Sequence, residues 1–178
     1  MPAMGIAMGA QPIVGYNYGA RAYGRMKLVL VQAIVLGIAI TTPLWATVVL
    51  APDLYAHLFG LPEIYMKETA WALVLYLMFI PILPIQTIGS NYFDATGQAA
   101  KATVLTLTRQ ILFLIPLLVF CPLVLPQVLP ITALESVWLA PSISDITSTL
   151  IVSGFLAFEW RRLRAAEAGE GSNGLHRA

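Results

Sequence analysis

Two ionisable side chains, Arg109 and Asp145, lie inside long apolar stretches of this sequence. A charge in the core of a bilayer costs about 2.5–3.5 kcal/mol even on insertion scales, so such groups usually face a partner or a wet cavity. Helical spacing puts Ser142 and Thr149 on the same face as Asp145. A buried carboxylate among hydroxyl groups could take up a proton or bind Na⁺ through its oxygens. Alternatively, Asp145 is structural and accepts hydrogen bonds from those hydroxyls or pairs with Arg109.

Arg109 has two possible roles of its own. It lies about two helical turns into its apolar stretch, counted from Lys101. We expect its long side chain to extend to the membrane interface, which is a structural or interfacial role. It could instead reach Asp145 if the two stretches are neighbouring antiparallel helices, because their depths would then differ by only roughly 5 Å.

Amide side chains in the apolar stretches form a second group of candidates. Gln86 and Asn91 belong to a polar strip with i,i+4 spacing near the end of one stretch, and Gln11 and Asn17 lie in the first. Such amides could line a pathway for a cation or a substrate, although hydrogen bonds between helices are their commoner use.

No residues are spaced for enzyme catalysis or for a structural metal. There is no pair of nucleophile and base, no phosphate-binding loop, and no Cys or carboxylate at zinc spacing from His57 or His176. The single cysteine, Cys121, cannot form an intramolecular disulfide. The net charge of +1 does not indicate a nucleic-acid partner. We therefore expect no enzyme activity, no metal and no cofactor.

The elements that carry these side chains are predicted to be membrane-spanning helices. Of the 178 residues, 58% are hydrophobic and 11% are charged, and the mean hydropathy is +0.79. A helix needs roughly 20 apolar residues to cross the bilayer. The sequence predicts an all-α polytopic bundle over 1–163 with a lipid bilayer as its solvent, followed by a disordered cytoplasmic tail over 164–178. Five spans are expected, at about 2–20, 27–51, 67–92, 102–125 and 136–160.

The charges between the spans predict the orientation of the bundle. Arg and Lys dominate the first connection and the segment after the fifth span, whereas acidic residues dominate the second and fourth connections. The positive-inside rule then places the first and third connections and the C-terminus in the cytoplasm. The first span would therefore run from outside to inside.

Four segments carry a resemblance to a known family. The first is Gly9 to Ala20, with the sequence GAQPIVGYNYGA. It closely resembles the end of the eighth helix in the multidrug and toxic compound extrusion (MATE) family. The segments NYFDATGQA at 91–99, TRQI at 108–111 and VWLAPSISD at 137–145 agree with the same family in the expected order.

The resemblance implies a fold, a function and a missing partner. MATE transporters have twelve helices in two six-helix lobes, and they export amphipathic cationic compounds in exchange for Na⁺ or H⁺. This chain would supply helices eight to twelve of a multi-pass protein of the cytoplasmic (inner) membrane. Its partners would be small amphipathic cations and the absent N-terminal lobe, without which we expect little or no transport.

Two alternatives to a transporter fragment are considered. One is a small membrane scaffold or assembly subunit that transports nothing. The other is a relative of the lipid-linked-sugar flippases, against which the Gln-Pro and Tyr-Asn-Tyr-Gly cluster of the first span argues.

Overall fold

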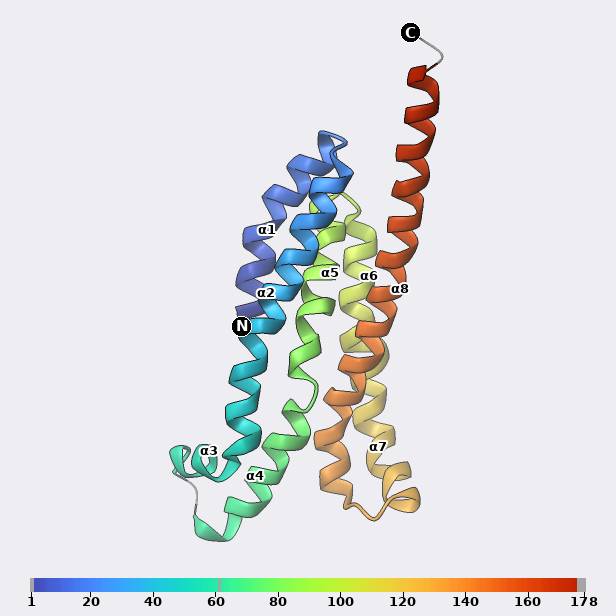
Figure 1. Ribbon diagram of the computed structural model, residues 1–178. Coiled ribbons are helices and arrows are strands. Elements are labelled where there is room, and N and C mark those ends of the chain that lie inside the picture. The colour runs from blue at the N-terminus through green and yellow to red at the C-terminus, as the bar shows by residue number, and fades with distance from the viewer. Residues whose placement is uncertain (1, 61, 176–178) are drawn as a thin grey trace.

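The computed structural model describes residues 2–60 and 62–175, and side chains as far as residue 165. All regular elements in these residues are helical (Figure 1). In chain order they are α1 (Pro2–Gly19), α2 (Tyr23–Leu50), α3 (Pro52–Leu58), α4 (Glu63–Leu77), the 3₁₀ turn η1 (Ile80–Ile82), α5 (Leu83–Ala95), α6 (Ala99–Leu107), the π-helical segment η2 (Thr108–Leu114), α7 (Ile115–Val128) and α8 (Ala133–Leu175). The predicted all-α membrane bundle is confirmed.

Four of the described helices are long and apolar enough to cross a membrane. They are Tyr23–Leu50, Glu63–Ala95, Ala99–Val128 and Ala133–Ala165. The first of the five expected spans, α1, is a helix of 18 residues but is not one of the four. Its polar residues, such as Gln11 and Asn17, and its glycines lower its hydropathy. In Figure 1 the start of α1 lies beside the middle of α2, so α1 covers only part of the height of the bundle.

Two of the spans change their helical geometry beside prolines. The 3₁₀ turn between α4 and α5 contains Pro81, and Pro84 lies in the first turn of α5. The π-helical segment η2 ends one residue before the start of α7, which has Pro116 in its first turn. Proline lacks a backbone N–H and its ring collides with the preceding turn. The helix there must tighten to 3₁₀ geometry, loosen to π geometry or bend. Pro12, Pro43 and Pro141 lie inside helices that continue through them.

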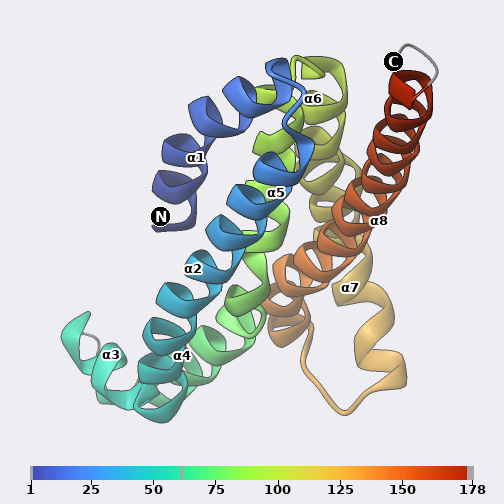
Figure 2. The same ribbon diagram turned by 45° about the horizontal axis from the view of Figure 1, so that its top comes forward.

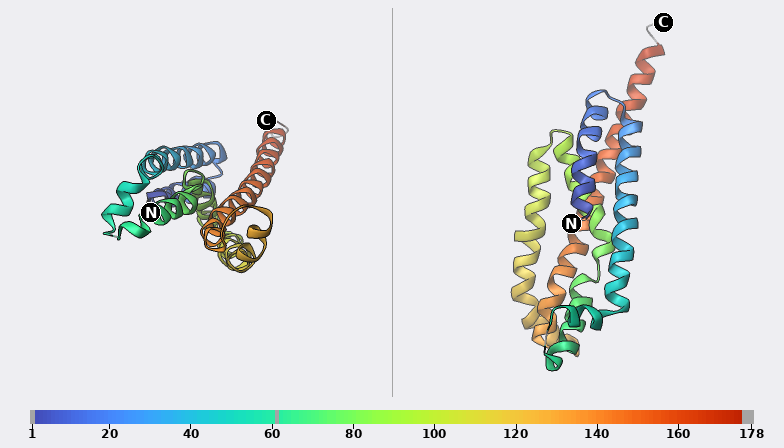
Figure 3. Two further views of the ribbon diagram at one scale, coloured as in Figure 1. Left: turned by 90° about the horizontal axis from the view of Figure 1, so that it is seen from below. Right: turned by 90° about the vertical axis from the view of Figure 1, so that its left-hand side faces the viewer.

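The core lies where α1, α2, α5 and α8 pack together. Met26 and Leu30 of α2, Tyr92 and Phe93 of α5, and Val152 of α8 are almost completely buried in one cluster. In contrast, many large apolar side chains of α2 and α7 are exposed, which is expected of surfaces that face lipid tails. Figures 2 and 3 show α6 and α7 beside α8, on the side of the bundle away from α1 and α2.

Close helix contacts in this core depend on two glycines. A Cβ atom added to Gly37 would lie 2.7 Å from Cβ of Pro84, and one added to Gly89 would lie 2.5 Å from Cγ1 of Val152. Small residues let membrane helices approach at backbone distance. Gly37 and Gly89 therefore hold α5 against α2 on one side and against α8 on the other.

The two ends of the bundle differ in charge. The turn from α1 to α2, the turn from α5 to α6 and the last part of α8 share one end, which we call the basic end (Figure 1). Its cations include Arg21, Arg25, Lys101 and Arg162. The prediction of a disordered tail differs from the structure, because α8 continues as a helix to Leu175. Alanine and glutamate are good helix formers, which favours this extension. Residues 176–178 of the predicted tail lie outside the described residues.

Candidate functional site

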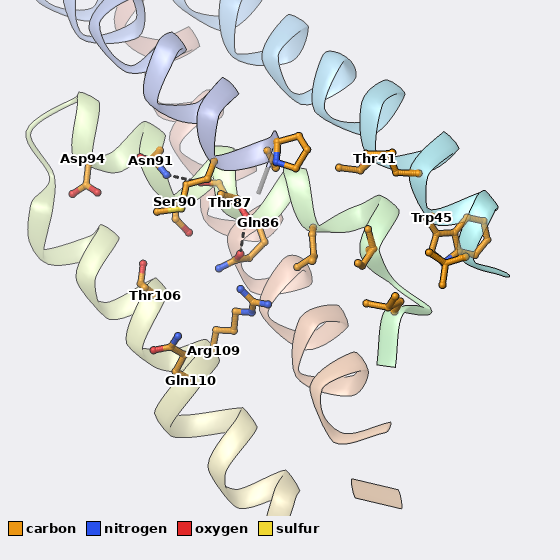
Figure 4. Close-up of a pocket in the computed structure, with 18 residues that line it drawn as sticks. Thr41, Trp45, Gln86, Thr87, Ser90, Asn91, Asp94, Thr106, Arg109 and Gln110 are labelled. Carbon is orange, nitrogen blue, oxygen red and sulfur yellow. Dashed lines mark hydrogen bonds between the residues drawn. The ribbon is translucent and has the colours of Figure 1, made fainter. Parts of the chain in front are cut away.

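A cavity of about 810 Å³ opens between α1, α2, α5 and the continuous helix formed by α6 and η2, which we call the α6–η2 rod (Figure 4). Sites for drug-sized molecules usually measure about 300–1,000 Å³, so this cavity is large enough for such a ligand. Its lining residues are Pro2, Ala3, Met4, Thr41, Leu44, Trp45, Val48, Leu77, Ile80, Leu83, Gln86, Thr87, Ser90, Asn91, Asp94, Thr106, Arg109 and Gln110.

One wall of the cavity is apolar. It is formed by Leu44, Trp45 and Val48 of α2, with Leu77 at the end of α4 and Leu83 at the start of α5. The break between α4 and α5 lies at this wall, because η1 connects them there. An indole ring among aliphatic side chains can hold the flat apolar part of an amphipathic molecule.

The opposite wall is polar and follows α5. Gln86 and Ser90 are only 4% and 6% exposed, and they share a helix face with Thr87 and Asn91 close by. Asn91 Nδ2 donates to the carbonyl of Thr87 at 2.9 Å, whereas the hydroxyl of Ser90 is buried without a partner among the described residues. The predicted candidates Gln86 and Asn91 therefore lie in the wall of the same cavity.

Arg109 and Asp145 form a direct ion pair beside this cavity. Arg109 Nη2 lies 2.6 Å from Asp145 Oδ1, and Nε donates to the same oxygen at 2.8 Å. The Arg109 side chain is 33% exposed and lines the cavity, whereas that of Asp145 is 11% exposed and is not among the lining residues. Of the two roles considered for Arg109, the structure has the pairing with Asp145, and the guanidinium separates that carboxylate from the cavity.

The π-helical segment η2 helps to position Arg109. In a π-helix the backbone hydrogen bonds join residues i and i+5, which shifts the directions of its side chains relative to an α-helix. Ser144 Oγ of α8 donates to the carbonyl of Arg109 at 2.9 Å and so ties this part of η2 to α8. Ser144 and Asp145 are consecutive on α8, so neighbouring residues hold the backbone and the side chain of Arg109.

The hydroxyl groups predicted to surround Asp145 point elsewhere. Ser142 Oγ donates to the carbonyl of Leu75 at 2.7 Å, and Ser148 Oγ donates to the backbone carbonyl of Asp145 at 3.1 Å. Thr149 Oγ1 is buried without a hydrogen-bond partner in the described part of the chain. The two hydroxyls expected beside Asp145 therefore do not bond its carboxylate, since Ser142 donates to a backbone carbonyl of α4 and Thr149 makes no hydrogen bond with the described residues.

Neither of the two amides of α1 is among the residues that line the main cavity. Gln11 lines a small recess of about 10 Å³ together with Asn91 and Tyr92. Asn17 Nδ2 donates to the carbonyl of Ile13 at 2.8 Å, one turn earlier on its own helix. Gln11 and Asn17 are therefore not brought together with Gln86 or Arg109.

A buried carboxylate at the basic end was not a candidate in the sequence. Glu159 is 1% exposed and accepts a hydrogen bond from Gln98 Nε2 at 3.2 Å. Lys101 Nζ lies 3.7 Å from its second oxygen, and Arg162 Nη1 lies 3.8 Å from the first. In the sequence, Glu159 is next to Trp160 and close to three arginines at the end of a span. This pattern is typical of residues at the membrane interface, so nothing in the sequence indicates that the Glu159 side chain is buried.

Six polar or charged residues that line the cavity were not among the predicted site residues, namely Thr41, Thr87, Ser90, Asp94, Thr106 and Gln110. Thr106 and Gln110 share a face of the α6–η2 rod with i,i+4 spacing, which could have marked them, and Asp94 lies at the end of α5 near the basic end. Among the described residues no group of three or more His, Cys, Asp or Glu side chains is placed to hold a metal ion.

Comparison with known proteins assigns the chain to a family. The family model MatE matches residues 1–120, which include α1, α2, α5 and the π-helical segment that carries Arg109. The chain belongs to the MATE family. The resemblance to the family is thereby confirmed, and three of the four sequence segments, all but the one at 137–145, lie within the matched residues.

Two solved structures show the same arrangement of helices as this MATE-family chain. One is a ligand complex of the MATE multidrug transporter DinF-BH, with 28% identity and a TM-score of 0.77. The other is the inward-facing conformation of a multidrug resistance MATE family transporter of the MOP superfamily, with 19% identity and a TM-score of 0.82. They cover 88% and 92% of this chain, which spans 34% and 37% of their own lengths. No curated protein sequence matches the chain at a significant level.

Proposed function

We propose that this chain forms part of a multidrug-type antiporter that exports amphipathic organic cations in exchange for Na⁺ or H⁺. The observation that carries the proposal is the cavity of about 810 Å³, with one apolar and one polar wall, in a chain of the MATE family. An apolar wall with a few polar groups opposite is the usual form of a site for drug-sized molecules. A scaffold subunit has no need of such a cavity.

The orientation proposed is that of the positive-inside rule. The basic end then faces the cytoplasm, and so does the C-terminal part of α8. Asp94 would lie near the cytoplasmic end of the cavity, where its exposed carboxylate attracts cations. We place the protein in the cytoplasmic (inner) membrane.

Asp145 is the proposed group for ion coupling. Its ionic partner is Arg109, so a proton or Na⁺ that bound the carboxylate would compete with the guanidinium. In a transporter completed with the remaining helices, Asp145→Asn should reduce export driven by an ion gradient. Unchanged transport and unchanged dependence on pH and Na⁺ in that variant would remove Asp145 from the mechanism.

The chain alone is proposed to bind substrate but not to transport it. Alternating access requires two lobes that move about a central site, and this chain spans about a third of the transporters that it resembles. Robust export of a dye by liposomes that contain the chain alone would contradict this part of the proposal.

Binding can be tested with the cationic dye rhodamine 6G and the purified chain in nanodiscs. We expect its fluorescence anisotropy to rise on binding, and Trp45→Ala to weaken binding because the indole forms part of the apolar wall. Trp71→Ala is the matched control, since Trp71 donates to Glu135 at 2.9 Å and does not line the cavity. Equal loss in both variants, or no binding above that of empty nanodiscs, would refute the proposed site.

A further inference from the structure

The polar wall of the cavity presents hydrogen-bond donors that have no acceptor among the residues that the structure describes. A guanidinium has five N–H donors, and only the Nε and Nη2 groups of Arg109 have a partner, Asp145, among the described residues. The amide nitrogen of Gln86 also donates to no described residue, whereas its oxygen accepts from the hydroxyl of Thr87 at 3.5 Å. Figure 4 shows the side chain of Arg109 pointing from its helix toward Gln86.

The hydroxyl of Ser90 adds a third donor to this wall. It lines the cavity one turn after Gln86, is 6% exposed, and has no hydrogen-bond partner in the described part of the chain. A buried donor without an acceptor is destabilising, because it has lost its hydrogen bond with water. A ligand that brought an acceptor to this position would offset that loss.

The charges along the cavity are arranged as a dipole. Asp94, near the basic end, is its only acidic lining residue within the described chain, and Arg109 is its only basic one. Asp94 belongs to α5 and Arg109 to the α6–η2 rod, and both lie on the same side of the cavity (Figure 4). A simple lipophilic cation would suit the Asp94 end and would leave the donors around Arg109 unsatisfied.

From this arrangement we infer that Arg109, Gln86 and Ser90 form a subsite for a carboxylate, so that the cavity prefers zwitterionic amphiphiles to matched monocations. The inference rests on the proposed function, namely that the cavity binds amphipathic substrates. A planar guanidinium and a neighbouring amide suit the two oxygens of a carboxylate. Asp145 already balances the charge of Arg109, so recognition depends on hydrogen bonds more than on net charge, and the expected preference is about tenfold.

The test uses two dyes that differ at one group. Rhodamine 6G is an ethyl ester and a monocation, and rhodamine 19 is the corresponding free acid, a zwitterion at neutral pH. Anisotropy titrations with the whole chain in nanodiscs, corrected with empty nanodiscs, should give rhodamine 19 an affinity about ten times that of rhodamine 6G. Equal affinities, or tighter binding of the ester, would overturn the inference.

Variants separate recognition from folding. Arg109→Gln combined with Asp145→Asn replaces the ion pair by two neutral amides, so no charge is left unpaired. We expect the ratio of the two affinities, rhodamine 19 over rhodamine 6G, to fall from about ten to about one in this double variant, whatever its absolute affinity for either dye. Gln86→Leu should lower the preference about threefold, whereas Gln127→Leu, an amide on α7 outside the cavity, should leave it unchanged.

The outcomes distinguish the two proposals. If neither dye binds, the proposed binding function fails and the carboxylate subsite fails with it. If both dyes bind and Trp45→Ala weakens both, while the double variant retains the tenfold preference, the binding function stands and the subsite is refuted.

Discussion

Two buried carboxylates on α8, Asp145 and Glu159, are held in different ways. Asp145 is bound by one arginine through two short contacts of 2.6 and 2.8 Å on a single oxygen. Glu159, about four turns further along the same helix, has an amide at 3.2 Å and a lysine at 3.7 Å. The first site borders the cavity, and the second lies in the packed basic end.

The difference indicates what each site can do. An ion pair with one close partner can be broken by one competing ion, which suits a group that exchanges partners during transport. A network of longer contacts loses little when one partner leaves, which suits a group that holds helices together. Gln98 and Lys101 come from the turn after α5 and from α6, so Glu159 connects this region to α8.

The largest expected effect comes from breaking the close pair on one side. Arg109→Met should destabilise the chain by about 3–5 kcal/mol, because it leaves Asp145 buried without a countercharge. Arg109→Met with Asp145→Leu should recover most of that stability. Thermal unfolding in detergent micelles measures both variants. If the double variant were as unstable as Arg109→Met alone, the ion pair itself would be needed to hold the helices together. Asp145 would then have the same structural role as Glu159.

A smaller effect is expected from the helix contact that lies between the two carboxylates. Gly89→Ala places a Cβ atom 2.5 Å from Val152 Cγ1, and overpacking of this kind costs about 1–3 kcal/mol. Gly154→Ala is the matched control, since a Cβ at Gly154 meets nothing within 4 Å. Urea or thermal unfolding of both variants gives the comparison. Equal stabilities would mean that α5 and α8 are packed less closely than described.

Glu159→Gln should have a moderate effect, about 1–2 kcal/mol of lost stability. The amide still accepts from Gln98 but loses its attraction to Lys101. Faster hydrogen exchange should be confined to the turn between α5 and α6 and the adjoining part of α8. A loss as large as that of Arg109→Met would contradict a distributed network.

Arg162→Gln should have the smallest effect, below about 0.5 kcal/mol. Its side chain is 68% exposed and lies 3.8 Å from Glu159, so water and salt screen the pair. Thermal unfolding at low and high salt tests this variant. A clear loss at both salt concentrations would assign Arg162 a larger part in holding Glu159.

Patterns that depend on local order in the chain were predicted correctly. Apolar stretches with few charges indicated the helical spans, since the bilayer requires backbone hydrogen bonds to be satisfied within each segment. Gln86 and Asn91 were expected in one polar strip of a helix, and both line the cavity. The first span was predicted to cross the membrane, but α1 is not among the helices apolar enough to do so.

Features that depend on which helices are neighbours required the three-dimensional arrangement. The depths of Arg109 and Asp145 along their spans were compatible with an ion pair between them and also with an arginine that extends to the membrane interface. Only the contact of η2 with α8 decides in favour of the ion pair. The burial of Glu159 and the direction of the hydroxyls near Asp145 were likewise set by packing. The order of residues was enough to predict the helices, their polar positions and the family. It could not predict which polar groups meet, because hydrogen-bond partners on different helices depend on packing and not on spacing along the chain.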